Sequence, residues 1–146
     1  MIIMNMQEQH VVPIAELEKL CFPDPWNEQC VASELTNPLS LWLVAVEDDR
    51  VVGYIGSQTV IDESDVMNVA VHPDYRQKGI ATGLIDALVS ELGKKGSHCL
   101  TLEVRASNEN AIRLYHALDF HEVGCRKNYY RNPKEDALIL RKEIEV

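Results

Sequence analysis

His72–Gly96 reads HPDYRQKGIATGLIDALVSELGKKG, and it joins a polar, glycine-containing loop to an amphipathic helix. The strand-like segment MNVAV (Met67–Val71) comes just before it, so the order is strand, loop and helix. The first N–H groups of a helix have no partner within the helix and carry partial positive charge. Small residues at positions 79, 81 and 83 let a ligand approach the backbone closely. The stretch therefore predicts an anion site suited to a pyrophosphate, to which Arg76 and Lys78 add charge-assisted contacts.

Two well-known nucleotide-binding loops share ingredients with this one but do not match it. A Walker A loop requires Gly-Lys-Ser/Thr at the start of the helix, and a dinucleotide fingerprint requires Gly-x-Gly-x-x-Gly. Neither pattern occurs in RQKGIATG (Arg76–Gly83). On physical grounds alone, an ordinary surface turn with a basic tip remains the alternative to an anion site.

The composition is typical of a globular protein with one core. The chain has 146 residues, of which 46% are hydrophobic and 25% charged, and this suits one domain spanning residues 1–146. The net charge of -9 disfavours nucleic-acid binding; it either attracts a cationic partner or simply keeps the protein soluble. The longest apolar run, Leu41–Val46, is too short to span a bilayer, and the N-terminus lacks a secretory pattern. We therefore expect a cytoplasmic protein that binds no membrane.

The cysteines and histidines do not have the spacing of a metal site. None of the four cysteines forms a Cys-x-x-Cys pair, and no histidine lies at ligand spacing from another. The favoured interpretation is therefore four buried or half-buried free thiols, with a zinc site or a nucleophilic cysteine as the alternatives: Cys21, Cys30, Cys99 and Cys125.

Hydrophobic periodicity and turn residues divide the rest of the chain. The pattern predicts a helix with an apolar face, a short capped helix, a hairpin, a buried strand, the helix of the opening stretch, a strand, a further capped helix and two closing strands. In chain order the elements are Pro13–Phe22, Asn27–Leu35, Ser40–Glu47 with Val51–Val60, Asp65–Val71, the helix ending near Gly93 and Gly96, His98–Val104, the helix capped near Ser107 or Asn108, and His121–Tyr130 with Asp136–Ile144. The first helix has Pro13 at its first position and an apolar face formed by Ile14, Leu17, Leu20 and Cys21. The last helix has an apolar face formed by Ala111, Leu114, Tyr115 and Leu118. This order predicts a mixed α/β fold around one central sheet and lacks the regular alternation of a doubly wound fold.

Two segments resemble the signatures of the GNAT superfamily of N-acetyltransferases. VAVHPDYRQKGIA resembles its acyl-CoA loop, and SNENAIRLYHALDF resembles its second signature. CFPDPW, SELTNP, MNVAVHP, LEVRASN and RKNYY further resemble the branch that acetylates the N-terminal alanine of ribosomal proteins, the RimI type. The resemblance runs from about Leu17 to the C-terminus. It implies a single GNAT domain with a mixed, mostly antiparallel central sheet flanked by helices.

The resemblance also implies a reaction and assigns residues to it. Acetyl-CoA is the co-substrate, no metal is needed, and Glu103 and Tyr115 match the branch's general base and general acid. The branch suggests that Tyr129 and Tyr130 line the acceptor groove, and Trp26 could pack under the acceptor site. The positions that match cofactor contacts are Val69, Ala70 and Val71 for pantetheine, Gln77, Lys78, Gly79, Ile80, Ala81 and Thr82 for the pyrophosphate with Arg76 in support, and Asn108.

Elementary chemistry favours an α-amine acceptor over a lysine. An α-amine with a pKa of about 7.7–8.0 is roughly one-tenth neutral at pH 7, whereas a lysine amine near ~10.4 is almost wholly charged. An ordinary glutamate is a weak base for either, so Glu103 needs a raised pKa or a bridging water. A phenol such as Tyr115 can donate a proton to the departing thiolate.

Each assigned residue also has a purely structural alternative. Tyr115 could be a core aromatic, Glu103 a solvated carboxylate, and Asn108 a plain helix cap. Tyr129 and Tyr130 could cap the sheet edge, and Trp26 could simply fill the core. Asp119 replaces the glycine that the family commonly has at that position, and aspartate tolerates the left-handed conformation expected there.

The leading hypothesis is a cytoplasmic enzyme that acetylates the N-terminal α-amine of a small-subunit ribosomal protein. It would act by direct transfer in a ternary complex. The alternatives are a GNAT enzyme for a small amine, such as a polyamine, an amino acid or an antibiotic, and a non-catalytic acyl-CoA-binding module.

Overall fold

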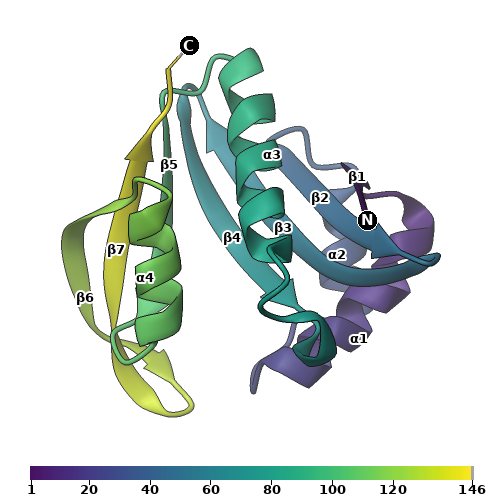
Figure 1. The fold of residues 1–146 in the computed structure, drawn as a ribbon, viewed down its shortest axis with the longest axis horizontal. Coiled ribbons are helices and arrows are strands. Elements are labelled where there is room, and N and C mark those ends of the chain that lie inside the picture. Colours follow the sequence, from purple (N-terminus) through teal and green to yellow (C-terminus); the bar gives the residue numbers. More distant parts are fainter. Residues whose placement is uncertain (146) are drawn as a thin grey trace.

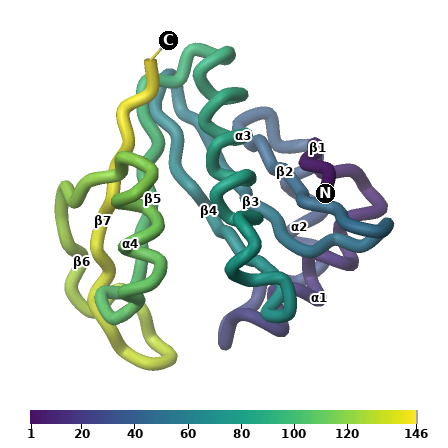
Figure 2. The backbone as a smooth tube through the Cα atoms, in the orientation of Figure 1, coloured from purple at the N-terminus to yellow at the C-terminus, as the bar shows by residue number. Residues whose placement is uncertain are grey.

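The computed structural model describes residues 1–145, and Figures 1 and 2 show their arrangement. The elements, in chain order, are β1 (Ile2–Asn5), η1 (Glu8–His10), α1 (Val11–Cys21), α2 (Glu28–Glu34), β2 (Ser40–Glu47), β3 (Arg50–Val60), β4 (Glu63–Val71), η2 (Pro73–Tyr75), α3 (Ile80–Lys94), β5 (Cys99–Arg105), α4 (Glu109–Ala117), β6 (His121–Arg131) and β7 (Lys134–Glu143).

All of the strands within residues 1–145 belong to one seven-stranded sheet of order β1-β2-β3-β4-β5-β7-β6. Every neighbouring pair is antiparallel except β4 and β5, which are parallel. The predicted mixed, mostly antiparallel sheet is therefore confirmed. The predicted β2–β3 hairpin is also confirmed, and it turns at Asp48 and Asp49, whose φ angles of 50° and 61° suit a tight hairpin turn.

Helices cover both faces of the sheet (Figure 1). On one face α3 and α4 bury a core with β2–β5 and β7 that includes Leu84, Leu88 and Leu100. On the other face α1 and α2 pack on β2–β4 through residues such as Ile14 and Val31. Both cores consist mainly of aliphatic side chains, whose removal from water drives such packing.

The parallel pair β4 and β5 hydrogen-bonds over only three residues. Glu63–Asp65 pairs with Cys99–Thr101, and beyond that point the two strands separate, as Figure 2 shows. The rest of β4 keeps its pairing with β3 alone, and the rest of β5 keeps its pairing with β7. The facing edges of β4 and β5 therefore keep backbone groups free for a ligand.

The apolar face predicted for the first helix is partly wrong. Leu20 is 56% exposed, whereas Glu18 is fully buried in the same helix. At 100° per residue Glu18 lies about 40° from Ile14 around the helix axis, and Leu20 about 120° away. The buried stripe therefore includes a carboxylate that the sequence interpretation left out.

Several boundaries differ from the prediction for local reasons. η1 leads directly into α1, so the helix begins at Val11 and Pro13 is its third residue, where no intrahelical N–H partner is lost. Gly93 lies inside α3, and Gly96, with a φ of 89°, follows its end. The strand β1 was not predicted at all.

Two predictions of burial are also wrong in part. Cys30 and Cys125 are exposed, while Cys99 is buried and Cys21 half-buried. All four are free thiols. The strand predicted to be buried exposes Met67, because a register shift between Gly56 and Ser57 of β3 makes Met67 the extra residue of a bulge in β4.

Candidate active site

The loop before α3 has the backbone geometry of an anion site. Gln77 and Gly79 both have left-handed φ angles, of 63° and 79°, and Gly79 is the N-cap of α3. No side chain hydrogen-bonds at this cap. Left-handed residues beside helical ones turn successive N–H groups toward a common point, and the helix dipole adds positive charge there. The N-terminus of a 15-residue helix is thus left available to an anion.

The two basic residues of the loop are held by neighbouring groups. The Arg76 Nε donates to the Val71 carbonyl at 3.2 Å, and its guanidinium lies 3.7 Å from the Cys21 sulfur. The Lys78 ammonium lies 5.2 Å from the centre of the Tyr75 ring. Arg76 therefore ties the loop back to the end of β4, and both charges stay next to the start of α3.

Gly79 and Gly83, two of the small residues of the loop and first helical turn, have different structural roles. A Cβ at Gly79 would meet nothing within 4 Å, so only its left-handed φ requires glycine. A Cβ at Gly83 would lie 3.2 Å from the Ile3 side chain. The packing of β1 against α3 therefore explains why position 83 is a glycine. The predicted close approach of a ligand to Gly83 is not required for that explanation.

Gly79→Ala is expected to lower the free energy of unfolding by about 1–2 kcal/mol, the usual range for a non-glycine residue with left-handed φ. Urea unfolding followed by circular dichroism measures this change. Gly79→Asn is the matched control, because asparagine tolerates this conformation and should lose less. Equal losses for Ala and Asn would show that φ is not the reason for glycine here.

The end of β4 presents the residues predicted for pantetheine. Val69, Ala70 and Val71 pair with Ile55, Tyr54 and Gly53 of β3, and their other edge faces the side from which β5 has separated. The Ala70 side chain is buried. Because Val71 leads through η2 into the loop, a ligand that runs along β4 reaches the start of α3 without a break.

Glu103 lies on β5, on the face opposite α3 and α4, and carries two contacts from β6. The Arg126 Nε is 3.2 Å from its carboxylate. A hydrogen bond to Glu103, more than burial, raises the pKa of the Tyr129 hydroxyl. Across the β4–β5 pairing, burial and then repulsion from Glu103 raise the pKa of Asp65. Glu103 is thus not an isolated solvated carboxylate but the centre of a polar cluster.

Tyr115 lies on the buried face of α4, as its spacing predicts. Its ring packs edge-on against Phe120, with ring centres 5.5 Å apart. Burial, and secondarily Tyr130, raises the pKa of Tyr115 to about 12. Burial and then Glu103 raise the pKa of Tyr130 to about 12 as well. Tyr130 therefore lies within electrostatic range of both predicted catalytic groups, which come from different elements.

The start of α4 is built as the sequence predicts. The Asn108 side chain accepts from the Ala111 N–H at 3.2 Å, so Asn108 is the N-cap. After the helix, Asp119 has a φ of 69°, which confirms the left-handed conformation expected for the residue that replaces glycine. The structural role of Asn108 is confirmed, and its contact with the cofactor remains a prediction.

Sequence reasoning missed the residues that hold the β6–β7 hairpin in place. The Arg105 guanidinium donates to the Pro133 carbonyl at 2.8 Å, contacts Glu135 at 3.3 Å, and stacks on the Tyr130 ring at 4.3 Å. Glu135 in turn accepts from the Ser107 N–H at 2.7 Å. Arg105 is part of the LEVRASN segment quoted for the resemblance, and its charge at a strand end was the available signal.

Trp26 is half-buried in the segment between α1 and α2. Its ring packs at a tilt on Trp42, with centres 5.4 Å apart, and Trp42 stacks on Tyr54 at 5.5 Å. The core-filling alternative therefore describes its ring well, and a role in acceptor binding remains a prediction. Tyr129, in contrast, is 48% exposed.

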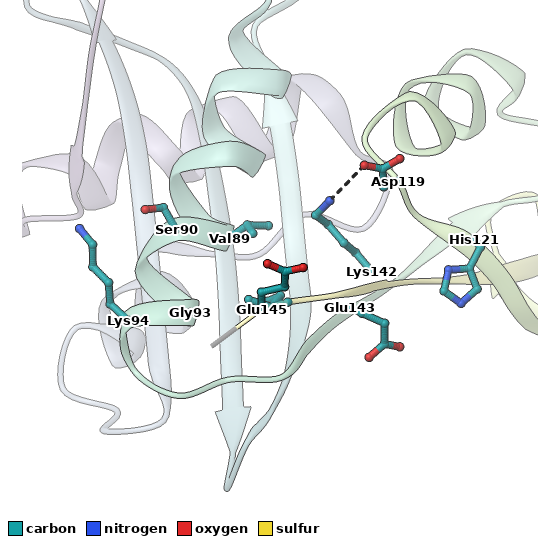
Figure 3. A pocket seen from close by; sticks show the side chains of 10 residues that line it. Val89, Ser90, Gly93, Lys94, Asp119, His121, Lys142, Glu143 and Glu145 are labelled. Carbon is teal, nitrogen blue, oxygen red and sulfur yellow. Dashed lines mark ion pairs between the residues drawn. The ribbon is translucent and has the colours of Figure 1, made fainter.

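Two surface hollows lie away from the candidate site residues described above. One, of about 760 Å³, lies between the C-terminal half of α3 and the end of β7, where Figure 3 shows Lys142 directed toward Asp119 at 3.9 Å. The other, of about 770 Å³, lies between α1 and the β2–β3 turn. Neither of these two is lined by a residue that the sequence assigns to catalysis or cofactor binding.

Two further properties concern only residues 1–145. In this part of the chain no three His, Cys, Asp or Glu side chains are arranged to hold a metal ion. No helix within it combines the length and the apolar character that crossing a membrane requires.

Residues 11–120 match the family model of the Acetyltransferase (GNAT) family. The ribosomal protein bS18-alanine N-acetyltransferase of Escherichia coli (strain K12) is 36% identical over 132 residues, which are 89% of this chain and 88% of the relative. The crystal structure of the ribosomal-protein-S18-alanine N-acetyltransferase from Escherichia coli superposes with a TM-score of 0.91 at 33% identity, covering 99% of this chain and 94% of that one. The chain belongs to the GNAT family of acetyltransferases.

A more distant structure shares the fold alone. An aminoglycoside 6′-N-acetyltransferase complexed with coenzyme A superposes with a TM-score of 0.85 at 20% identity, covering 100% of this chain and 98% of that one. Since that enzyme is named for an aminoglycoside and not for a protein, the fold by itself does not select the acceptor.

Proposed function

We propose that this chain transfers the acetyl group of acetyl-CoA to the N-terminal α-amine of a protein, and that this acceptor is a small-subunit ribosomal protein beginning with alanine. The observation that carries the proposal is the 36% identity, along 89% of the chain, to the Escherichia coli ribosomal protein bS18-alanine N-acetyltransferase. In this proposal residues 1–146 act as one domain in the cytoplasm, without direct nucleic-acid or membrane binding.

Acetyl-CoA would lie between the separated strands and the start of α3. Its pantetheine would pair with the free edge of β4 at Val69–Val71. Its pyrophosphate would lie on the N–H groups of residues 77–82, supported by the charges of Arg76 and Lys78. The free edge and the uncapped helix start both favour this placement.

The acceptor amine would attack the thioester carbonyl directly in a ternary complex. The nitrogen forms a bond to the carbonyl carbon and loses a proton to Glu103, directly or through a water. The carbon–sulfur bond then breaks, and Tyr115 donates its proton to the departing sulfur, which leaves as the CoA thiol. A tyrosine holds its proton at neutral pH, and burial raises the pKa of Tyr115 further, to about 12.

The acceptor would enter on the side of Glu103, Tyr129 and Tyr130, with Trp26 at the edge. The net charge of -9 favours the approach of a basic protein. An α-amine, with its pKa of about 7.7–8.0, needs only a modest base, and a carboxylate or a carboxylate-bound water can serve.

The proposal is tested with pairs of peptides that differ only at the N-terminus. One member has a free N-terminal alanine and the other a blocked one, and both carry an internal lysine. We expect CoA release and a single added acetyl group, located by mass spectrometry on the α-amine, for the free member only. Peptides with other first residues and a panel of small amines are run in parallel.

The other outcomes point to the alternatives. Acetylation of the internal lysine alone, or turnover of a polyamine, amino acid or aminoglycoside without turnover of peptides, would overturn the α-amine proposal. Binding of acetyl-CoA with no turnover of any amine would favour a non-catalytic acyl-CoA-binding module.

A further inference from the structure

Glu18 is a buried carboxylate for which the proposed reaction has no role. It lies on α1 with its side chain fully buried. Burial raises its pKa, while hydrogen bonds from the Trp26 N–H and the Asn68 amide oppose that rise. Replacing a buried charged group by a well-packed apolar one is often neutral or even stabilising. Fold stability alone therefore does not explain a glutamate at this position, and its partners are informative.

One set of hydrogen bonds connects Glu18 with β4, the strand whose end is proposed to bind acetyl-CoA. The Asn68 amide donates to the two carboxylate oxygens at 2.8 and 3.1 Å, and the Asn68 carbonyl oxygen accepts from the Val69 N–H at 3.1 Å. Asn68 directly follows Met67, the extra residue of the β4 bulge. A bulge bends its strand and redirects the following residues. Glu18 thus holds the Asn68 side chain, which fixes the direction of β4 after the bulge.

The bulge also lies at the point where the sheet opens. Asp65 is the last residue of β4 that pairs with β5, and the bulge follows two residues later. Val69–Val71, the proposed pantetheine-binding edge, comes directly after Asn68. A small rotation of the backbone at the bulge would therefore change the direction of every N–H and C=O group on that edge.

A second hydrogen bond connects the same carboxylate with the segment proposed to lie at the acceptor side of the site. The Trp26 N–H donates to Glu18 Oε1 at 3.3 Å. This bond anchors the segment between α1 and α2, which has no regular structure from Phe22 to Asn27 and so depends on such contacts for its position. The Trp26 ring packs on Trp42, which stacks on Tyr54.

We propose that Glu18 is a positioning residue that joins the acetyl-CoA strand to the acceptor segment, through Asn68 on one side and the Trp26 backbone on the other. It touches neither substrate. It keeps the thioester carbonyl and the acceptor amine in mutual alignment, because one rigid, buried carboxylate accepts hydrogen bonds from both halves of the site. This inference rests on the proposed transfer reaction.

The first test is Glu18→Gln, which keeps the shape of the side chain but turns one acceptor oxygen into a donor facing the Asn68 amide. We expect kcat/KM to fall by up to roughly 100-fold, with a rise in the acetyl-CoA Kd, since small misplacements of reacting groups have effects of this size. Glu34→Gln is the matched control. Glu34 is a buried glutamate of α2 that is bonded to Ser40, Asn37 and Gln58, and its replacement should lower Tm while leaving both constants unchanged.

The decisive test is the reciprocal double variant Glu18→Gln with Asn68→Asp. Here the amide introduced on α1 donates to the carboxylate introduced on β4, and that carboxylate still accepts from the Val69 N–H. The oxygen of the introduced amide still accepts from the Trp26 N–H. We expect the double variant to recover most of the lost kcat/KM and acetyl-CoA affinity. A merely destabilising substitution would not be rescued in this way at a temperature where all variants are folded.

The outcomes separate this inference from the proposed function. Acetyl-CoA binding is measured by calorimetry without any acceptor, and turnover is measured with whichever amine the unmodified protein accepts, so a different acceptor leaves the comparison intact. Wild-type constants in Glu18→Gln, or a double variant as impaired as the single one, would overturn the role of Glu18. If Glu18→Gln does not fold, Asn68→Ala replaces it, and unchanged constants in that variant would equally overturn the role.

Discussion

Replacing Tyr115 by phenylalanine is expected to lower kcat by roughly 10²–10⁴-fold, the usual contribution of a general acid. The change removes one hydroxyl and keeps the ring that packs against Phe120, so the fold and the acetyl-CoA Kd should be unaffected. The loss should be similar across the neutral range, because a pKa of about 12 keeps Tyr115 protonated well above the pH of any ordinary assay. Steady-state kinetics with a free N-terminal peptide measures the effect.

Tyr75→Phe is the matched control for this variant. Tyr75 lies beside Lys78 in the loop region, and its ring makes the contact with the ammonium, so loss of its hydroxyl should leave kcat unchanged. If Tyr115→Phe turns over at the wild-type rate, Tyr115 is not the acid and its burial on α4 is structural.

Glu103→Gln is expected to lower kcat/KM for the acceptor by roughly 10²–10⁴-fold near pH 7, where a base must take a proton from the amine. The deficit should shrink as the pH rises above about 8, because the α-amine then loses its proton to solvent. Glutamine keeps the size of the side chain, so the Tyr129 and Arg126 side chains should remain nearby. A pH–rate profile of both proteins with the same peptide measures this dependence.

The control for Glu103→Gln is Glu122→Gln, which neutralises an exposed carboxylate at the start of β6. Its profile should follow that of the unmodified protein. A deficit in Glu103→Gln that stays constant from pH 7 to pH 9 would contradict a role limited to deprotonating the amine. No deficit at pH 7 would remove Glu103 from the base role altogether.

The local parts of this structure could be predicted because their causes are local. Asn27 and Asn108 cap helices through bonds to N–H groups three residues away, at 2.8 and 3.2 Å. Asp48 and Asp49 turn the hairpin, and Gly79 starts α3 with the φ angle that glycine adopts most easily. Each signal lies within a few residues of its effect, so the order of helices and strands after Val11 could be predicted from the chain alone.

Contacts between distant segments explain the misses at β1, Glu18 and Arg105. The four residues of β1 form a strand because they pair with Leu43–Val46 of β2, some forty residues away in sequence. The buried Glu18 carboxylate finds its partner in Asn68, which lies fifty residues further along the chain. Arg105 gained its role from the Pro133 carbonyl and Glu135, which belong to another hairpin.

The sequence by itself determined the loop at Arg76–Gly79, its helix and the capped α4, since short-range hydrogen bonds and backbone preference decide these. The catalytic roles of Glu103 and Tyr115 stay predictions that the resemblance to the GNAT superfamily implies. Only the tertiary structure decided that β4 and β5 separate after three paired residues, and that Glu103 lies among Arg126, Tyr129 and Asp65. It also decided that the Glu18 carboxylate accepts hydrogen bonds from both Asn68 and the Trp26 N–H. The physical reason is that strand pairing and the burial of charge depend on which distant groups meet, and only the folded chain brings those groups together.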